Sequence, residues 1–135
     1  MKHAAFLDSG IFIAFMSQKD RWHRQAIALF SGPKPRWSTS MLVLSEAYSW
    51  FLHRMGEEAA RSFRLLVDNM EGLQIFEATR EHHKEVAKVL ERHRGSKLTY
   101  VDASSLALIA RHKIKRVWAT DHHLGLTGAE VIPRS

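Results

Sequence analysis

The sequence predicts an α/β fold in which a short parallel sheet of four to five strands is flanked by helices. Short apolar runs alternate with longer segments of helical apolar spacing, the pattern of a parallel sheet with helices on both faces. Acidic residues stand at several of the expected strand ends and helix starts. In a parallel sheet these ends lie together at one edge, which is where ligands bind. No repeat, low-complexity tract or linker divides the chain, so we expect a single domain over residues 1–135.

Residues 1–70 are expected to form two strands and four helices. The first strand ends at Asp8, and Asp20 is a candidate cap for the second helix. Gly32-Pro33 marks a turn, and Ser40 is a good N-cap for the third helix. The expected elements are a strand at Ala4–Leu7, helices at Ile11–Met16 and Arg21–Phe30, a strand at Arg36–Thr39, and helices at Met41–Met55 and Glu57–Met70.

The second half is expected to continue the alternation. Thr79 opens a helix with a charged outer face, and Thr99 precedes Asp102 by three residues, which is capping-box spacing. The helix after Thr99 is apolar on nearly all sides, as expected for a helix inside a domain. The expected elements are a strand at Leu73–Phe76, a helix from Thr79 to about Arg94, a helix at Tyr100–His112, and strands at Val117–Ala119 and Glu130–Ile132.

The composition limits the possible classes of protein. No apolar run approaches the ~20 residues that cross a bilayer, and no secretory signal follows the N-terminal Met-Lys-His, so a cytoplasmic protein without membrane contact is expected. The absence of cysteine excludes disulfides and thiol chemistry. The net charge of +6 makes a polyanion such as RNA a reasonable partner, although a basic protein without a nucleic-acid role fits the charge equally well.

Four acids occupy positions that a parallel sheet would bring together. Asp8 and Asp121 follow strands, and Asp102 stands at a helix start. Glu46 interrupts an apolar run inside a helix, where an unpaired carboxylate is costly to bury. Each acid also has a structural interpretation, since Asp102 could cap its helix, the strand-end aspartates could hold turns, and Glu46 could pair with an arginine.

The four acids together favour a cation site. Two like charges 4 Å apart repel by about 4 kcal/mol at an effective dielectric constant of 20, which is large against a net stability of about 5–15 kcal/mol. A divalent cation would offset this repulsion. Because the ligands are carboxylate oxygens and the chain has no cysteine, Mg²⁺ or Mn²⁺ is the expected ion.

The segments FLDSG, LSEA, LTYVDASSLALIA and ATDHH, in this order, resemble the PIN-domain family of metal-dependent ribonucleases, and most closely its VapC-type toxins. The resemblance covers the whole chain and implies a three-layer α/β/α fold. It further implies that Asp8, Glu46, Asp102 and Asp121 bind one or two Mg²⁺ or Mn²⁺ ions. A metal-activated water then cuts RNA, leaving a 5′-phosphate and a 3′-hydroxyl. A homodimer and a small antitoxin partner are also implied.

The resemblance assigns supporting roles to Ser9 and Thr120, whose hydroxyls lie beside site aspartates in the family. Many members carry an additional acid two residues after the last aspartate, where this chain has His123, which could bind metal, contact phosphate or do neither. The basic residues expected to contact RNA lead into the Asp102 helix and are Arg92, Arg94 and Lys97. Lys113, Lys115 and Arg116 precede a strand, so they are expected to face away from the acids.

Other functions are compatible with parts of this pattern. An RNA-processing nuclease without an antitoxin and a nucleic-acid-binding domain that cuts nothing both remain open. Asp121-His122-His123 also matches the tripeptide of the DHH phosphoesterases, but the other motifs of that family are absent. His82-His83 is expected on a solvated helix face, and Trp37 is expected to pack in the core rather than to stack on a base.

Overall fold

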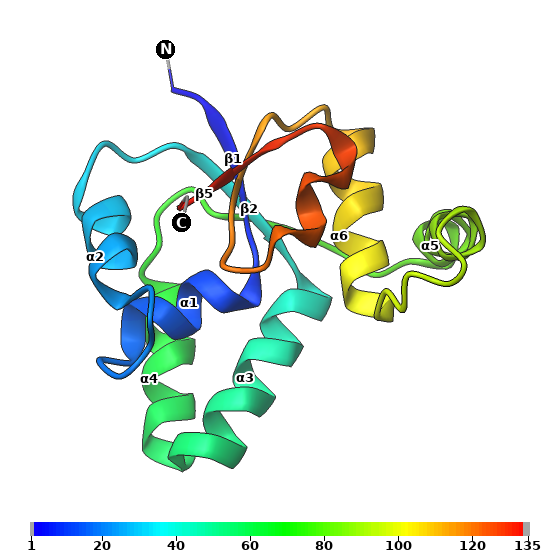
Figure 1. Cartoon of the computed structure of the whole chain (residues 1–135). Helices are drawn as coiled ribbons and strands as arrows, with labels where there is room; N and C mark the ends of the chain where they lie inside the picture. The colour runs from blue at the N-terminus through cyan, green and yellow to red at the C-terminus, as the bar shows by residue number, and fades with distance from the viewer. Residues whose placement is uncertain (1, 134–135) are drawn as a thin grey trace.

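A computed structural model describes residues 2–133, with only the backbone of His122, and it confirms the predicted parallel sheet. Five strands lie in the order β3-β2-β1-β4-β5, and every neighbouring pair is parallel. The central strand β1 therefore ends between the carboxyl ends of β2 and β4 (Figure 1). The strands are β1 (Ala4–Leu7), β2 (Arg36–Ser40), β3 (Gln74–Phe76), β4 (Arg116–Trp118) and β5 (Glu130–Ile132).

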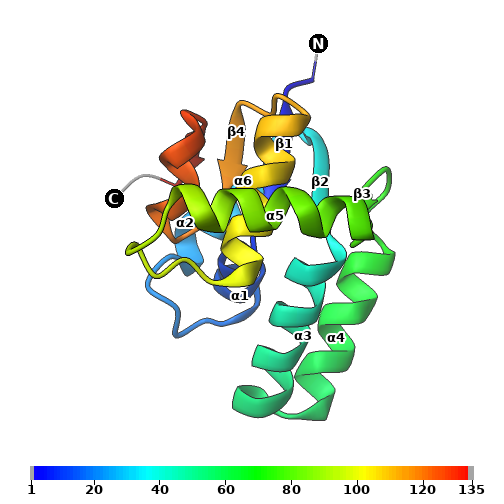
Figure 2. The same cartoon turned by 90° about the vertical axis from the view of Figure 1, so that its right-hand side faces the viewer.

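Helices cover the sheet on both sides, so the chain has the predicted three-layer α/β/α architecture (Figure 1). Helices α3 and α4 pack against each other as a hairpin that extends beyond the sheet, and α5 crosses α6 (Figure 2). The helices are α1 (Ser9–Met16), α2 (His23–Ser31), α3 (Met41–Met55), α4 (Glu57–Asp68), α5 (Arg80–Arg92) and α6 (Tyr100–Arg111), and a 3₁₀ helix η1 spans His122–Thr127. None of the described helices is both long and apolar enough to cross a bilayer.

Buried phenylalanines fix α1 against the α3–α4 hairpin. The rings of Phe12 and Phe63 meet edge to face at 5.3 Å between centroids, and Phe51 and Phe63 stack at 5.2 Å. Each of these side chains is at most 2% exposed. Truncating a buried phenylalanine of this kind costs about 3–5 kcal/mol. This contact holds the two helices that carry Ser9 and Glu46 in a fixed relation.

The start of α2 differs from the prediction. The Asp20 carboxylate accepts a hydrogen bond from the backbone N–H of Trp22 (2.8 Å), and α2 begins at His23. Asp20 thus holds a turn before the helix instead of capping it, an alternative that aspartate side chains readily adopt. The 3₁₀ helix η1 lies in a segment where no element was predicted.

The predicted solvated position of His82 is wrong. Its side chain is 3% exposed, and Nε2 lies 2.6 Å from the Ser104 hydroxyl, so the pair connects α5 to α6. Burial lowers the pKa of His82, and the neutral ring is therefore favoured. His82 shares the inner face of α5 with buried Val86 and Val89, whereas exposed His83 contacts the Tyr100 hydroxyl at 2.8 Å.

Candidate metal-binding site

An open hollow of about 550 Å³ at the carboxyl edge of the sheet collects all four candidate acids, and we call it the acid pocket. The hydroxyl residues Ser9 and Thr120 also line it. Strand ends β1 and β4 and the starts of α1 and α6 supply most of these positions, as expected for the ligand-binding edge of a parallel sheet. The full lining is Asp8, Ser9, Gly10, Ile13, Glu46, Ser49, Trp50, His53, Arg54, Thr99, Asp102, Thr120 and Asp121.

Asp8 is the acid whose ionisation the other three acids oppose. It follows β1, its backbone N–H donates to the Trp118 carbonyl (3.0 Å), and its side chain is only 5% exposed. Burial, together with the charges of Glu46, Asp102 and Asp121, raises the pKa of Asp8 from 3.8 to about 7, while the Ser9 amide opposes the shift. The field at Asp8 therefore comes from three further carboxylates, which is the condition that a cation relieves.

Glu46 reaches the pocket from α3 and is held by α1. The Ser9 hydroxyl donates to the Glu46 carboxylate at 2.6 Å. The Ser40 hydroxyl accepts from the Val43 backbone N–H (3.1 Å), which caps α3 as predicted. Glu46 is exposed, so its carboxylate opens onto the pocket instead of being buried in the core.

Asp102 is displayed by the start of α6. The Thr99 hydroxyl accepts from the Asp102 backbone N–H at 3.1 Å and caps the helix as predicted. The oxygen that caps the helix therefore belongs to Thr99, while the side chain of Asp102 lines the pocket. A carboxylate in this first turn is also favoured by the helix dipole.

His123 lies beside the two C-terminal acids. Its backbone N–H and its Nδ1 atom each lie 2.9 Å from Oδ1 of Asp121. One potential ligand atom each from Asp102, Asp121 and His123 fits within a 4.8 Å span. This set of two carboxylates and an imidazole, next to Asp8 and Glu46, could hold a divalent cation, and carboxylate oxygens are the ligands that suit Mg²⁺ or Mn²⁺.

Gly10 has a steric role that the sequence did not reveal. A β-carbon placed at Gly10 would lie 2.2 Å from the Thr120 hydroxyl oxygen, far inside van der Waals contact. Only glycine therefore allows the first turn of α1 to approach Thr120 this closely. The Ser9-Gly10 pair that follows β1 was the available signal, but the partner could not be identified without the fold.

Sequence reasoning also missed the outer wall of the pocket on α3. Trp50, His53 and Arg54 line the acid pocket, and none of them was among the predicted site residues. The signal was available in the sequence, because these positions follow Glu46 by four, seven and eight residues. Such spacings place side chains on one face of a helix.

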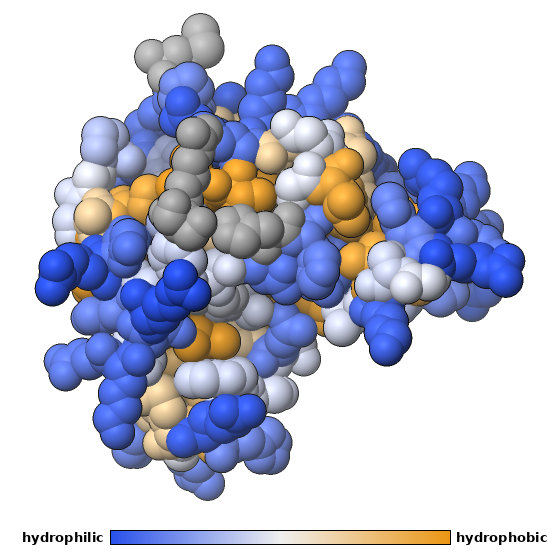
Figure 3. Space-filling view, viewed as in Figure 1, coloured by the Kyte–Doolittle hydropathy of each residue, from blue (hydrophilic) through white to orange (hydrophobic). Residues whose placement is uncertain are grey.

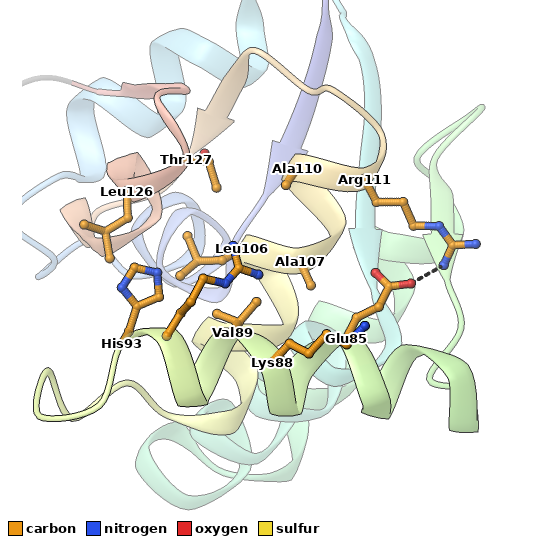
Figure 4. Close-up of a pocket in the computed structure, with 11 residues that line it drawn as sticks. Glu85, Lys88, Val89, His93, Leu106, Ala107, Ala110, Arg111, Leu126 and Thr127 are labelled. Carbon is orange, nitrogen blue, oxygen red and sulfur yellow. Dashed lines mark hydrogen bonds and ion pairs between the residues drawn. The ribbon is translucent and has the colours of Figure 1, made fainter.

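The residues predicted to bind RNA lie elsewhere. Arg92 lines a second hollow, which we call the α5–α6 groove. This groove lies between α5, α6 and η1 (Figure 4). Arg94 pairs with Glu91 at 3.5 Å on the surface, and Lys97 has a left-handed backbone with φ of 57°. These three residues are absent from the lining of the acid pocket. The surface over α5, at the right of Figure 3, is hydrophilic.

The basic residues before β4 lie at the opposite end of the sheet, as expected. Arg116 is the first residue of β4 and pairs with Glu130 at 3.5 Å. Lys113, Lys115 and Arg116 line a small hollow together with the residues that begin β1 and β2. The strand directions thus place carboxylates at one edge of the sheet and a cluster of cations at the other.

Comparison with known proteins agrees with this architecture. The profile of the PIN domain family matches residues 5–128. The fold is similar to VapC20 of Mycobacterium tuberculosis, a sarcin–ricin loop-cleaving toxin (TM-score 0.84, 23% identity, 93% of this chain and 95% of that chain). It is also similar to a toxin–antitoxin complex from Klebsiella pneumoniae (TM-score 0.69, 16% identity, 96% of each chain) and to FitAcB from Neisseria gonorrhoeae (TM-score 0.67, 12% identity, 96% of each chain).

No curated protein sequence matches the chain at a significant level. The family profile nevertheless covers most of the sequence, and the fold aligns with the structural neighbours over more than nine-tenths of this chain. Because the match extends from β1 to the end of η1, it includes every element that supplies an acid to the pocket. The chain belongs to the PIN domain family.

Proposed function

We propose that this protein is a metal-dependent endoribonuclease and the toxin component of a type II toxin–antitoxin pair in the cytoplasm. The observation that carries the proposal is the convergence of Asp8, Glu46, Asp102 and Asp121 on one pocket, where burial and the three other carboxylates raise the pKa of Asp8. Membership of the PIN domain family and similarity to an RNA-cleaving toxin support the same activity. The net charge of +6 supports RNA as the substrate.

Asp8, Glu46, Asp102 and Asp121 would hold the ion. When bound, Mg²⁺ or Mn²⁺ activates a water molecule and stabilises the charge that develops on the phosphate. The Ser9 hydroxyl orients the Glu46 carboxylate, and His123 orients that of Asp121. Hydrolysis breaks the bond between phosphorus and the 3′ oxygen, so the products carry a 5′-phosphate and a 3′-hydroxyl.

The partner assignment has separate support. One structural neighbour is a toxin–antitoxin complex and VapC20 is a toxin, which favours a small antitoxin that binds this chain. The family resemblance also favours a homodimer. Co-expression with a neighbouring short reading frame tests the first assignment, because an antitoxin would co-elute with this chain and suppress cleavage. The elution volume of this chain in size-exclusion chromatography tests the homodimer.

The activity is tested by incubating purified protein with a mixed RNA pool in Mg²⁺, in Mn²⁺ or in EDTA. We expect cleavage with either ion, none in EDTA, and at least ~100-fold slower cleavage by Asp102→Asn, since amide oxygen is a much poorer ligand for these cations than carboxylate. The control Asp68→Asn makes the same change at an exposed position at the end of α4 and should cut normally. Full activity of a natively folded Asp102→Asn protein would contradict the proposal.

A further inference from the structure

Side chains of different chemical character follow one another along one face of α3, from the inner end of the acid pocket to its outer edge. Glu46, Ser49, Trp50, His53 and Arg54 recur at helical spacing, and all five line the pocket. We call them the α3 stripe. Eight residues separate Glu46 from Arg54, so at ~1.5 Å per residue the stripe extends about 12 Å along the helix. It connects the proposed catalytic acids to the exposed end of the α3–α4 hairpin (Figure 2).

The stripe changes from anionic to aromatic to cationic. The Ser9 hydroxyl holds Glu46 at its inner end. Trp50 is half-buried, meets Phe51 edge to face at 5.4 Å, and is followed by the exposed side chains of His53 and Arg54. The Arg54 guanidinium carbon lies 5.8 Å from the centroid of the Trp50 ring. An indole ring beside a guanidinium group is a combination that binds unstacked bases and phosphates.

The negative charge of the acid pocket opposes the binding of RNA, so a cationic side chain near the pocket is needed to attract the phosphates. Its four carboxylates repel the phosphates of an approaching strand, and even a bound divalent ion offsets only part of their charge. The Arg54 guanidinium lies on the same open wall, where it can attract the phosphates that flank the cleavage point. The predicted RNA-binding residues Arg92, Arg94 and Lys97 do not line this pocket, which leaves the stripe as its basic wall.

We propose that the α3 stripe binds a single-stranded segment of the RNA substrate beside the scissile phosphate. Trp50 stacks on an unpaired base, and Arg54, with His53, binds the neighbouring phosphate. Stacking needs a base whose face is free, so the stripe selects a loop or an unpaired region over a continuous duplex. This assignment rests on the proposed function and adds to it the substrate form and the residues that hold it.

The test measures binding and cleavage separately. Binding of a fluorescein-labelled single-stranded oligoadenylate is followed by anisotropy in Ca²⁺ at low salt, and a duplex of the same length serves as the comparison. Trp50→Leu should weaken single-strand binding about 5- to 150-fold, the range expected for losing one stacked base. Trp50→Phe retains an aromatic face and should bind close to wild type.

Arg54→Gln provides an independent test at an exposed position where misfolding is not expected. Loss of one phosphate contact should reduce the slope of log K against log salt by about 0.7. Arg64→Gln on α4 removes the same charge outside the acid pocket and should leave the slope unchanged. In cleavage assays, Trp50→Leu and Arg54→Gln should raise KM and leave kcat near wild type, because they remove binding rather than metal ligands.

The possible failures are distinguishable. If wild type cuts RNA in Mg²⁺ but both Trp50→Leu and Arg54→Gln bind and cut like wild type, the stripe assignment is wrong and the proposed function stands. The assignment is also wrong if natively folded variants lose kcat with KM unchanged. If wild type neither binds nor cuts the RNA, the proposed function fails and the stripe assignment fails with it.

Discussion

Two hollows of this molecule, the α5–α6 groove and the acid pocket, differ in how their acids are balanced. In the α5–α6 groove, Glu85 lies 3.2 Å from Arg111 (Figure 4). Lys88 and Arg92 line the same groove. In the acid pocket, the charged groups that act on Asp8 are Glu46, Asp102 and Asp121. Both hollows are open to solvent, so shape does not separate them. The Asp8 carboxylate in the acid pocket is destabilised by burial and by the neighbouring acids, whereas the Glu85 carboxylate in the groove is paired with Arg111.

This difference has a thermodynamic meaning. A native state is more stable than the unfolded chain by only about 5–15 kcal/mol, so a repulsive cluster that is never neutralised would be a substantial burden. An ion that binds the folded state alone removes the repulsion and adds stability in proportion to its binding. The acid pocket should therefore respond strongly to pH, metal and charge substitution, and the groove should respond weakly.

The largest stability effect should come from Asp8→Asn in EDTA. With a pKa of about 7 in the folded protein against 3.8 unfolded, Asp8 binds a proton more tightly in the native state. Its ionisation therefore costs stability as pH rises from about 4 to 7, by up to about 4 kcal/mol. Asp8→Asn should raise the melting temperature in EDTA, with a gain that grows across this window and is constant above it.

A matched control makes this result specific. Glu77→Gln removes a negative charge at an exposed position after β3 and should not reproduce the pH-dependent gain. Mn²⁺ should stabilise wild type more than Asp8→Asn, because the variant lacks one proposed ligand. An Asp8→Asn protein that melts at or below wild type in EDTA, with an unchanged Mn²⁺ response, would show that the four acids do not form a shared cation site.

A smaller effect is expected at Gly10. Alanine there would place its β-carbon 2.2 Å from the Thr120 hydroxyl oxygen, so Thr120 must rotate or α1 must shift. We expect Gly10→Ala to lose about 1–3 kcal/mol of stability and to slow RNA cleavage, since the displaced hydroxyl lies within the acid pocket. Chemical denaturation and initial cleavage rates provide the two measurements.

The proposed cause can be isolated in a double-mutant cycle. Adding Thr120→Ala to Gly10→Ala removes the clash and should recover part of the lost stability. Gly32→Ala is the matched control, because its β-carbon would lie 3.4 Å from the nearest atom, the Ala28 carbonyl oxygen. Independent, additive effects of Gly10→Ala and Thr120→Ala would contradict the steric explanation.

The predictable parts of the fold were those specified by local pattern. Alternating apolar runs and turn residues located every strand of the sheet, and the Thr99 and Ser40 caps form the expected hydrogen bonds. The parallel topology then brings Asp8 and Asp121 to one edge, which explains why acids at strand ends were informative. Their roles as metal ligands remain predictions, as do those of Glu46 and Asp102.

The features that were missed depend on contacts between distant elements. The burial of His82 results from docking α5 on α6, where Ser104 meets its ring. Helical spacing with Val86 and Val89 pointed inward, but the charged residues around it masked that signal. The close approach of Gly10 to Thr120 has no local signature, because it requires β4 to lie beside β1.

The smallest effect should come from the ion pair in the α5–α6 groove. Glu85 and Arg111 have side chains 36% and 55% exposed, so solvent screens their attraction, and exposed pairs contribute about 0.2–1 kcal/mol. Arg111→Gln, Glu85→Gln and the double variant should therefore give a coupling energy within that range, and it should shrink as salt rises. RNA cleavage by Arg111→Gln should stay within about twofold of wild type, because neither partner lines the acid pocket. A loss of cleavage tenfold or larger would show that the groove is part of the active surface, and the contrast between the two hollows would then be wrong.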